Sequence, residues 1–238
     1  MPSAGSEKPP GFRISLIVLF LVYLSLVITN FPAKGWLMGW DNIIPEFNFF
    51  ANFQRGLSVW QENQGLGIVG GHGFAASLPH TIIQFLLSLF IPLAYLRAVF
   101  TSIMLLVGTL GCFFLGLKLF GKISRELSCP LSLISALYYM LNLGTVQMFY
   151  ISLEGFTFHY AFLPWLLYYL HSFYEMPSAK NLLYFILISL VASGQGFIPP
   201  LFIIYGLFLA VFCFIFFLTD RSKASLGKIL LILSVTLF

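Results

Sequence analysis

The sequence predicts an all-α protein: a polytopic transmembrane helix bundle with two amphipathic surface helices in its first extracytoplasmic loop. Three observations support this fold class. The 238 residues are 59% hydrophobic and only 8% charged, whereas an ordinary soluble domain is about 25% charged. Several uncharged stretches approach the roughly 20 residues that a helix needs to cross a bilayer. Aromatic residues reach 18%, and Trp and Tyr favour the membrane interface. A soluble enzyme is therefore excluded.

The uncharged stretches predict six complete spans and the beginning of a seventh. Residues 14–31 follow a polar tail, residues 1–13, and lack the cleavage site of a signal peptide. The later spans are predicted at 98–117, 127–153 and 155–174, with two shorter spans in 181–219 that separate at the Gly- and Pro-containing stretch 194–200, and a start at 229–238. Because the last stretch is only ten residues long, we expect residues 14–238 to be the N-terminal part of a longer membrane domain.

The basic residues predict the orientation of the bundle. Residues 78–92 are too short to span, and their Thr81, Gln84 and Ser88 share one narrow arc, which suits a helix at the membrane surface. Without a span there, nine basic residues fall inside and three outside, as the positive-inside rule expects. We therefore expect a multi-pass cell-membrane protein with a cytoplasmic N-terminus and an extracytoplasmic loop at 32–80. The inner set is Lys8, Arg13, Lys118, Lys122, Arg125, Lys180, Arg221, Lys223 and Lys228, and the outer set is Lys34, Arg55 and Arg97.

This first outer loop holds most of the outer polar side chains, including Asp41. Two interpretations of Asp41 stay open. It caps or turns the chain before a helix, or it is a carboxylate at the mouth of a membrane cavity that acts as general base or metal ligand. Pro45 suits the first turn of a helix that runs to about residue 60. Glu46 falls on the apolar side of that helix, so it either leaves at the first turn or points into an enclosed site.

The same predicted helix supplies candidate binding residues. Its apolar face, expected on lipid or on the bundle, consists of Phe50, Phe53 and Leu57, and the opposite arc carries Asn48, Asn52 and Arg55. Arg55 either anchors the helix to lipid phosphates or binds the phosphate of a lipid-linked donor through its planar guanidinium. Further along the chain, Glu154 and His159 are expected on the outer side, where they either border the same cavity or serve as interface anchors.

A glycine-rich run at 65–73 contains a formal G-x-G-x-x-G match, but no strand precedes it and a dinucleotide site is rejected. It is expected to be a turn, with close approach to a lipid phosphate as the alternative, and His72 within it is a candidate substrate-binding residue. His72 and His80 are not spaced as a helical metal pair. No disulfide or metal site is expected from the three cysteines, which lie in or beside apolar runs: Cys112, Cys129 and Cys213.

The stretch GWDNIIPEFNFFANFQRGLSVWQENQGLGIVGGHGFAASLPH, residues 39–80, is followed by LRAVFTSIMLLVGTLGCFFLGLKLFG, residues 96–121. Together they resemble the N-terminal region of bacterial membrane proteins related to the mycobacterial arabinofuranosyltransferases, within the GT-C superfamily of membrane glycosyltransferases. The resemblance covers residues 10–175. The acidic residue after the first span falls on Asp41, although Asn42 follows it and no paired acidic motif is present.

The resemblance implies transfer of a sugar from a polyprenyl-phosphate donor to an extracytoplasmic glycan, lipid or protein acceptor, with inversion at the sugar carbon. Asp41, with Glu46 nearby, would be the catalytic carboxylate or a ligand of a divalent metal ion. The expected partners are the bilayer, the donor and the acceptor, and not nucleic acid. The alternative is a non-catalytic membrane protein, either a transporter of lipid-linked glycans or an assembly subunit. A transporter needs polar groups inside its spans, and the predicted spans offer only Ser, Thr, Asn142, Gln147 and His159.

Overall fold

The computed structural model describes residues 8–32, 36–37, 47–62, 65–69, 75, 77–151, 154–193, 199–219 and 223–237. These residues are almost entirely helical, so the predicted all-α fold class is confirmed. The elements are α1 (Phe12–Asn30), α2 (Phe49–Leu57), β1 (Trp60–Gln61), β2 (Ile68–Val69), α4 (Leu78–Ser88), α5 (Leu93–Phe120), α6 (Arg125–Leu141), α7 (Leu143–Ile151), α8 (Glu154–Glu175), α9 (Ala179–Val191), α10 (Pro199–Thr219) and α11 (Lys223–Leu237).

Three of the described helices, α1, α5 and α10, are long and apolar enough to cross a membrane. The surface of α10 shows why lipid must surround it, because Ile203, Leu207 and Phe214 are all 60% exposed or more. A helix satisfies its own backbone hydrogen bonds, which hydrocarbon cannot do. The protein is therefore a membrane protein with transmembrane helices.

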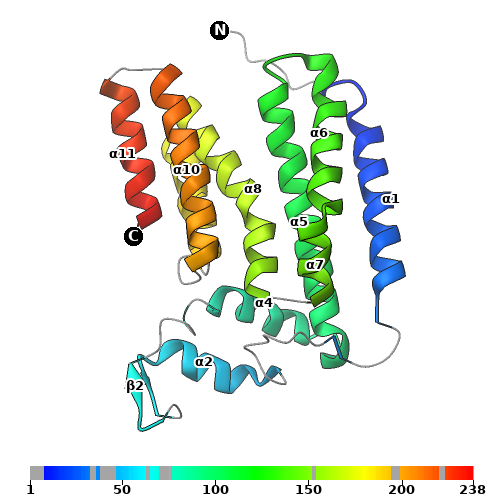
Figure 1. Ribbon diagram of the computed structural model, residues 1–238, viewed down its shortest axis with the longest axis vertical. Coiled ribbons are helices and arrows are strands. Elements are labelled where there is room, and N and C mark those ends of the chain that lie inside the picture. Colours follow the sequence, from blue (N-terminus) through cyan, green and yellow to red (C-terminus); the bar gives the residue numbers. More distant parts are fainter. Residues whose placement is uncertain are drawn as a thin grey trace.

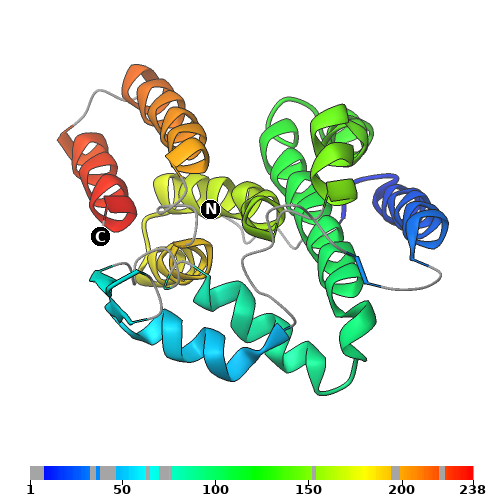
Figure 2. The same cartoon turned by 60° about the horizontal axis from the view of Figure 1, so that its bottom comes forward.

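Figure 1 shows the helices in two groups above two shorter, transverse helices. α1, α5, α6 and α7 form one group, and α8, α10 and α11 belong to the other. α5 joins them, because it packs along both α6 and α8. The start of α1, the turn between α5 and α6, and the start of α11 lie at the upper end. α4 lies across the lower end, with α2 beside it (Figure 2).

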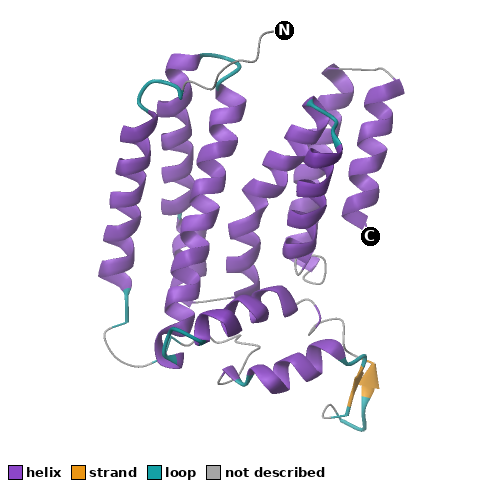
Figure 3. Ribbon diagram, turned by 180° about the vertical axis from the view of Figure 1, so that it is seen from behind, coloured by secondary structure: helices purple, strands orange, loops and turns teal. Residues whose placement is uncertain are grey.

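Glycines allow α5 to approach its two neighbours closely. A Cβ added at Gly108 would lie 2.5 Å from the Tyr160 ring of α8, and one at Gly116 would lie 2.8 Å from the Ser132 hydroxyl of α6. Small residues are common where membrane helices pack through close backbone contact, because no hydrophobic effect drives the association. These contacts place α5 between α6 and α8. Figure 3 shows the same two groups of helices from behind.

The stretch 127–153, predicted as one span, contains two helices. α6 ends at Leu141 and α7 begins at Leu143, with Asn142 between them. The Asn142 side chain explains the break, because its amide donates to the carbonyls of Tyr138 and Tyr139 while its Oδ1 accepts from the Thr145 amide. An Asn side chain that competes for backbone groups in this way favours a helix terminus over a helix interior.

α8 contains Pro164, which cannot donate to the carbonyl of Tyr160 four residues earlier. The Tyr139 hydroxyl of α6 fills the missing position, since it donates to the Tyr160 carbonyl at 2.9 Å. The two tyrosine rings also stack, with centroids 4.4 Å apart. α8 and α6 are thus joined where the helix backbone would otherwise be unsatisfied.

The structure changes the predicted start of the first outer helix. α2 begins at Phe49 and not at Pro45, since the side chain of Asn48 caps it by accepting from the Ala51 amide at 3.1 Å. Two residues of its predicted apolar face are largely exposed, Phe50 at 74% and Leu57 at 77%. Phe53 of the same face packs edge-on against Phe85 of α4.

On α4, the predicted polar arc faces the protein, because Thr81 and Gln84 are buried. Near the C-terminal end of the described chain, α11 starts at Lys223 and not at 229. The glycine-rich run begins in a small hairpin, where β1 pairs with β2 in antiparallel register. Gly65 and Gly67 both take positive φ in its turn, so the predicted turn is observed there.

Candidate functional site

A buried ion pair lies where α4, α5 and α8 meet. Arg97, in the second turn of α5, donates from Nε to Oε1 of Glu154 at 2.8 Å, and the two side chains are only 3% and 4% exposed. Gln84 of α4 donates to the same carboxylate oxygen at 3.0 Å. Glu154, predicted in a turn between two spans, is in fact the first residue of α8 and buried. A carboxylate in this environment requires such partners, because an unpaired buried charge is very costly.

His80 lies one turn before Gln84 on α4 and completes the buried polar cluster. Its ring packs against the rings of Phe100 and Phe158, with centroid distances of 6.4 and 5.8 Å. Burial lowers the pKa of His80 to about 4, even though the nearby charge of Glu154 acts in the opposite direction. The imidazole is therefore neutral at physiological pH. Within the described part of the chain, His80 Nε2 and Gln84 Oε1 have no hydrogen-bond partner.

Arg97 also contacts the first outer loop at two points. Its Nη1 donates to the Leu37 carbonyl at 2.9 Å, and its guanidinium lies over the Phe47 ring, 4.6 Å from the centroid. Phe47 in turn stacks on Trp36, with centroids 6.2 Å apart. We call Trp36, Leu37 and Phe47 the neck, because they bracket residues 38–46, the acidic segment that carries Asp41 and Glu46.

The backbone of Phe47 has an unusual conformation that its surroundings stabilise. Phe47 has a φ of 49°, a left-handed conformation that a bulky residue rarely adopts. Such a conformation persists only where the surroundings compensate its cost. Here the side chain is 3% exposed and packs against Arg97, Trp36 and Phe49, which gives that compensation.

An apolar cavity of about 520 Å³ lies beside the neck, between α1, α5 and the α6–α7 region. Trp36 and Leu37 line it, as do Ala98 and Thr101, which follow Arg97 on α5. The volume is within the range of small-molecule pockets. Three of the remaining lining residues are polar, Asn30, Ser102 and Thr145. The others are apolar: Leu26, Val27, Phe31, Pro32, Leu105, Met140, Val146 and Phe149.

The structure brings together only part of the predicted site. Asp41, Glu46 and His72 lie outside the described residues, so their catalytic, metal-binding and substrate-binding roles stay predictions. Glu154 joins Arg97, and His159 is buried one turn further along α8. Within the described ranges, no group of three or more His, Cys, Asp or Glu side chains could hold a metal ion.

The three predicted binding residues of α2 have different surroundings in the structure. Asn48 caps the helix. Asn52 is half-buried, and its amide nitrogen has no hydrogen-bond partner within the described part of the chain. Arg55 is half-buried, and its backbone carbonyl accepts from the Gln61 side chain at 2.9 Å. Among the described contacts, none joins these three residues to the Arg97–Glu154 pair.

The role of Arg97 was missed at the sequence level, where it counted only as an outer charge. A signal was present. Arg97 and Glu154 are isolated, opposite charges that border long apolar stretches, and the predicted topology put both on the outer side. Opposite charges at one membrane depth are expected to pair when they are buried. Gln84 and His80 carry no comparable signal in the sequence, because residues 78–92 fit a surface helix.

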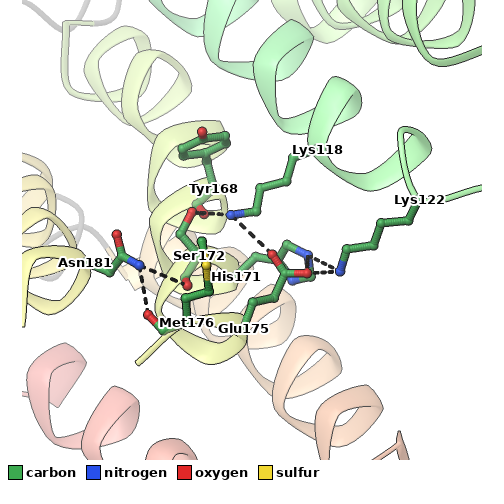
Figure 4. A network of polar contacts seen from close by, with 8 residues as sticks. All are labelled: Lys118, Lys122, Tyr168, His171, Ser172, Glu175, Met176 and Asn181. Atoms are coloured by element: carbon green, nitrogen blue, oxygen red, sulfur yellow. Dashed lines mark hydrogen bonds and ion pairs between the residues drawn. The ribbon is translucent and has the colours of Figure 1, made fainter. Parts of the chain in front are cut away.

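A second polar cluster lies at the opposite end of α5 (Figure 4). Lys118 Nζ lies 3.3 Å from Glu175 Oε2 and 2.5 Å from the Ser172 hydroxyl, and Lys122 pairs with the same carboxylate. His171 Nε2 is 3.4 Å from Glu175 Oε1. Lys122 is 55% exposed, so this cluster is partly solvated and ties the end of α5 to the end of α8.

The chain matches no family model, no curated protein and no solved structure.

Proposed function

We propose that the protein is a membrane glycosyltransferase that moves a sugar from a polyprenyl-phosphate donor to a glycan or lipid acceptor outside the cytoplasmic membrane. The observation that carries the proposal is the position of the neck. Trp36 and Leu37 line the apolar cavity and directly precede the acidic segment. A lipid-linked donor needs an apolar volume for its chain next to polar groups for its reacting end.

In this proposal the sugar carbon exchanges one oxygen for another. The acceptor hydroxyl attacks the sugar carbon, the bond from that carbon to the phosphate oxygen breaks, and polyprenyl phosphate leaves. A carboxylate of the acidic segment, Asp41 or Glu46, takes the proton of the acceptor hydroxyl. Glu154 does not suit this role, because Arg97 and Gln84 already occupy its Oε1 in a buried position.

The proposed orientation places the N-terminus in the cytoplasm and the first large loop outside. The charge distribution supports it, because Lys118, Lys122 and Arg125 all lie at the end of α5 opposite to the neck. An excess of basic residues is typical of the cytoplasmic side. The donor would then meet α2, α4 and the acidic segment at the outer membrane surface.

The experiment measures sugar transfer by membranes that contain the protein, with a radiolabelled mixture of polyprenyl-phosphate sugars as donor. The variant is Asp41→Asn, and the matched control is Glu62→Gln, an exposed carboxylate in the hairpin of the same loop. We expect Asp41→Asn to lose at least about 100-fold in transfer, the typical contribution of a positioned general base. The control should retain the wild-type rate.

Two results would overturn parts of this proposal. Equal transfer by wild type and Asp41→Asn would move the catalytic role away from Asp41. No transfer by any of the three proteins, with insertion verified, would refute the enzyme and favour the transporter or assembly subunit.

A further inference from the structure

We infer that the exposed face of α4, together with the turn that joins α4 to α5, is an interaction surface for lipid acyl chains. The lipids belong to the membrane leaflet at this end of the bundle, which is the outer leaflet in the proposed orientation. The inference does not depend on the proposed function. We call this surface the α4 face, and it consists of Ile82, Leu86, Leu89, Phe90, Pro92 and Leu93.

The amphipathic character of α4 is the reverse of what water requires. Its polar residues Thr81 and Gln84 are buried against the protein, whereas Phe90, just beyond its C-terminal end, is 85% exposed. The exposed residues 82, 86, 89 and 90 recur at helical spacing, so they form one apolar stripe. A helix at the surface of a water-soluble protein turns such a stripe toward the core. The medium against the α4 face is therefore apolar.

The polar side chains of α4 have partners for their donors within the protein. The Thr81 hydroxyl donates to the Ser77 carbonyl at 2.7 Å, and the Ser88 hydroxyl donates to the Phe85 carbonyl at 2.6 Å. The Gln84 amide donates to Glu154. These donors need no water, as is required of a segment in contact with hydrocarbon.

The turn between α4 and α5 also satisfies its own backbone donors. The N–H groups of Leu89, Phe90 and Ile91 all donate to carbonyls in the last turn of α4, at 2.9–3.4 Å. Pro92 follows and has no N–H group. An exposed turn in water has no need of this arrangement, because water can bond to a free N–H. In lipid each unsatisfied N–H costs several kcal/mol, so this turn suits contact with acyl chains.

The α4 face continues the lipid-facing surface of the transmembrane helices. Tyr95, in the first turn of α5, stacks on Phe31 at the C-cap of α1, with centroids 5.8 Å apart. Ile28, near the same end of α1, is 67% exposed, so the bilayer around α1 reaches the start of α5. Residues 63–96 contain no Asp, Glu, Lys or Arg. Lipid, and not water, is the medium that this composition favours.

The length of α5 gives the depth of α4 in the membrane. α5 has 28 residues and is about 42 Å long, which exceeds the hydrocarbon thickness of about 30 Å. Because Lys118 in its last turn marks one boundary, the start of α5 reaches the opposite boundary. α4 lies across the bundle there (Figure 2). A helix in the membrane plane buries its apolar face about 5–10 Å into the boundary between headgroups and acyl chains.

The first experiment measures how accessible nitroxide spin labels are to oxygen, which concentrates in lipid, and to a water-soluble nickel chelate. The labels are attached to Ile82→Cys, Leu86→Cys and Phe90→Cys in phosphatidylcholine vesicles, with the three native cysteines replaced by alanine. Leu207→Cys is the lipid control, because Leu207 is 63% exposed on α10. Glu62→Cys is the water control, because Glu62 is an exposed, charged residue of the hairpin.

We expect the three labels on the α4 face to be more accessible to oxygen than to nickel, as at Leu207, with the reverse order at Glu62. The ratio of the two accessibilities also gives the depth of each label. Positions 82 and 90 are about 12 Å apart along a helix axis. Because α4 lies in the membrane plane, labels at these two positions should have equal depth.

Three results would overturn the inference. Accessibility to nickel as high as at Glu62 would mean that water covers the α4 face. Low accessibility to both reagents would mean that protein covers it, such as a second copy of the chain. A depth difference of about 12 Å between positions 82 and 90 would mean that α4 enters the bilayer along the membrane normal.

A second measurement leaves the native cysteines in place. Phe90→Trp adds a fluorophore to the α4 face, and Leu207→Trp is the lipid control. The vesicles contain phosphatidylcholine brominated on its acyl chains, which quenches tryptophan on contact. We expect brominated lipid to quench the fluorescence that each variant adds to that of the wild type. Added fluorescence of Phe90→Trp that persists while that of Leu207→Trp is quenched would refute the contact with lipid.

Discussion

The buried Arg97–Glu154 pair allows a quantitative test by a double-mutant cycle. The variants are Arg97→Gln, Glu154→Gln and the combination of both. Each single change leaves one charge in a site where the side chains are only 3% and 4% exposed. Removing one partner of a buried pair typically costs 3–5 kcal/mol, because the other charge is left uncompensated. We therefore expect each single variant to lose about 3 kcal/mol of the free energy of unfolding.

The double variant removes both charges together, so it should lose far less than the roughly 6 kcal/mol sum of the two single losses. An interaction energy of about 2–3 kcal/mol between the two sites would follow. The measurement is the loss of helical circular dichroism on titration with SDS in mixed micelles. Lys122→Gln is the control, since its pair with Glu175 is more than half exposed on the lysine side and should contribute less than about 1 kcal/mol.

Two results would refute this reasoning. Strictly additive losses in the double variant would mean that Arg97 and Glu154 do not interact in the folded protein. Single losses no larger than that of Lys122→Gln would mean that the pair is hydrated and not buried.

Three further predictions concern pH, packing and topology. The pKa of His80 is 6.5 in the unfolded chain and about 4 in the folded protein. The free energy of unfolding therefore falls as the pH drops through this window, by about 2 kcal/mol between pH 7 and 5. His80→Phe should abolish this part of the pH dependence of the melting temperature. Gly108→Ala should lower the free energy of unfolding by about 2 kcal/mol through overpacking on α8, whereas Gly206→Ala, with open space around it, should cost nothing in the same denaturation assay. Cysteine placed at Ser58 should react with a membrane-impermeant thiol reagent in whole cells. Cysteine placed at Ile123, which is 79% exposed in the turn before α6, should react only after the membrane is opened. The reverse pattern would overturn the proposed orientation.

The long helices were predictable because the hydropathy of a segment shows whether lipid or water surrounds it. The stretches 14–31 and 98–117 correspond to α1 and α5, which are long enough to span. The break at Asn142 was not predictable from apolar content, because a single capping side chain decides it. The apolar arc of α2 was expected on lipid or on the bundle, and a helical wheel does not say which of its residues meets the bundle. Phe53 packs against Phe85 of α4, whereas Phe50 and Leu57 are largely exposed.

The candidate site was predictable only as a region. The loop 32–80 was identified by its polar content, and the neck does belong to it. The group that organises the neck, Arg97, lies outside that loop, on α5, and its partner Glu154 is 57 residues further along the chain. Periodicity and spacing describe neighbours in sequence, so they carry no information about a contact of this separation. Only the packing of α4, α5 and α8 brings these residues together.

The hydrogen bond from the Tyr139 hydroxyl to the Tyr160 carbonyl couples Tyr139 to Pro164, two residues that are distant in the sequence. Pro164 creates the vacancy in the α8 backbone, and Tyr139 on α6 fills it. In a chain where residue 164 is alanine, the helix would complete its own bond and the hydroxyl would become redundant there. Tyr139→Phe should therefore be costly beside Pro164 and nearly silent beside Pro164→Ala. In related sequences the two positions should change together, so that the proline is retained only where a donor is retained.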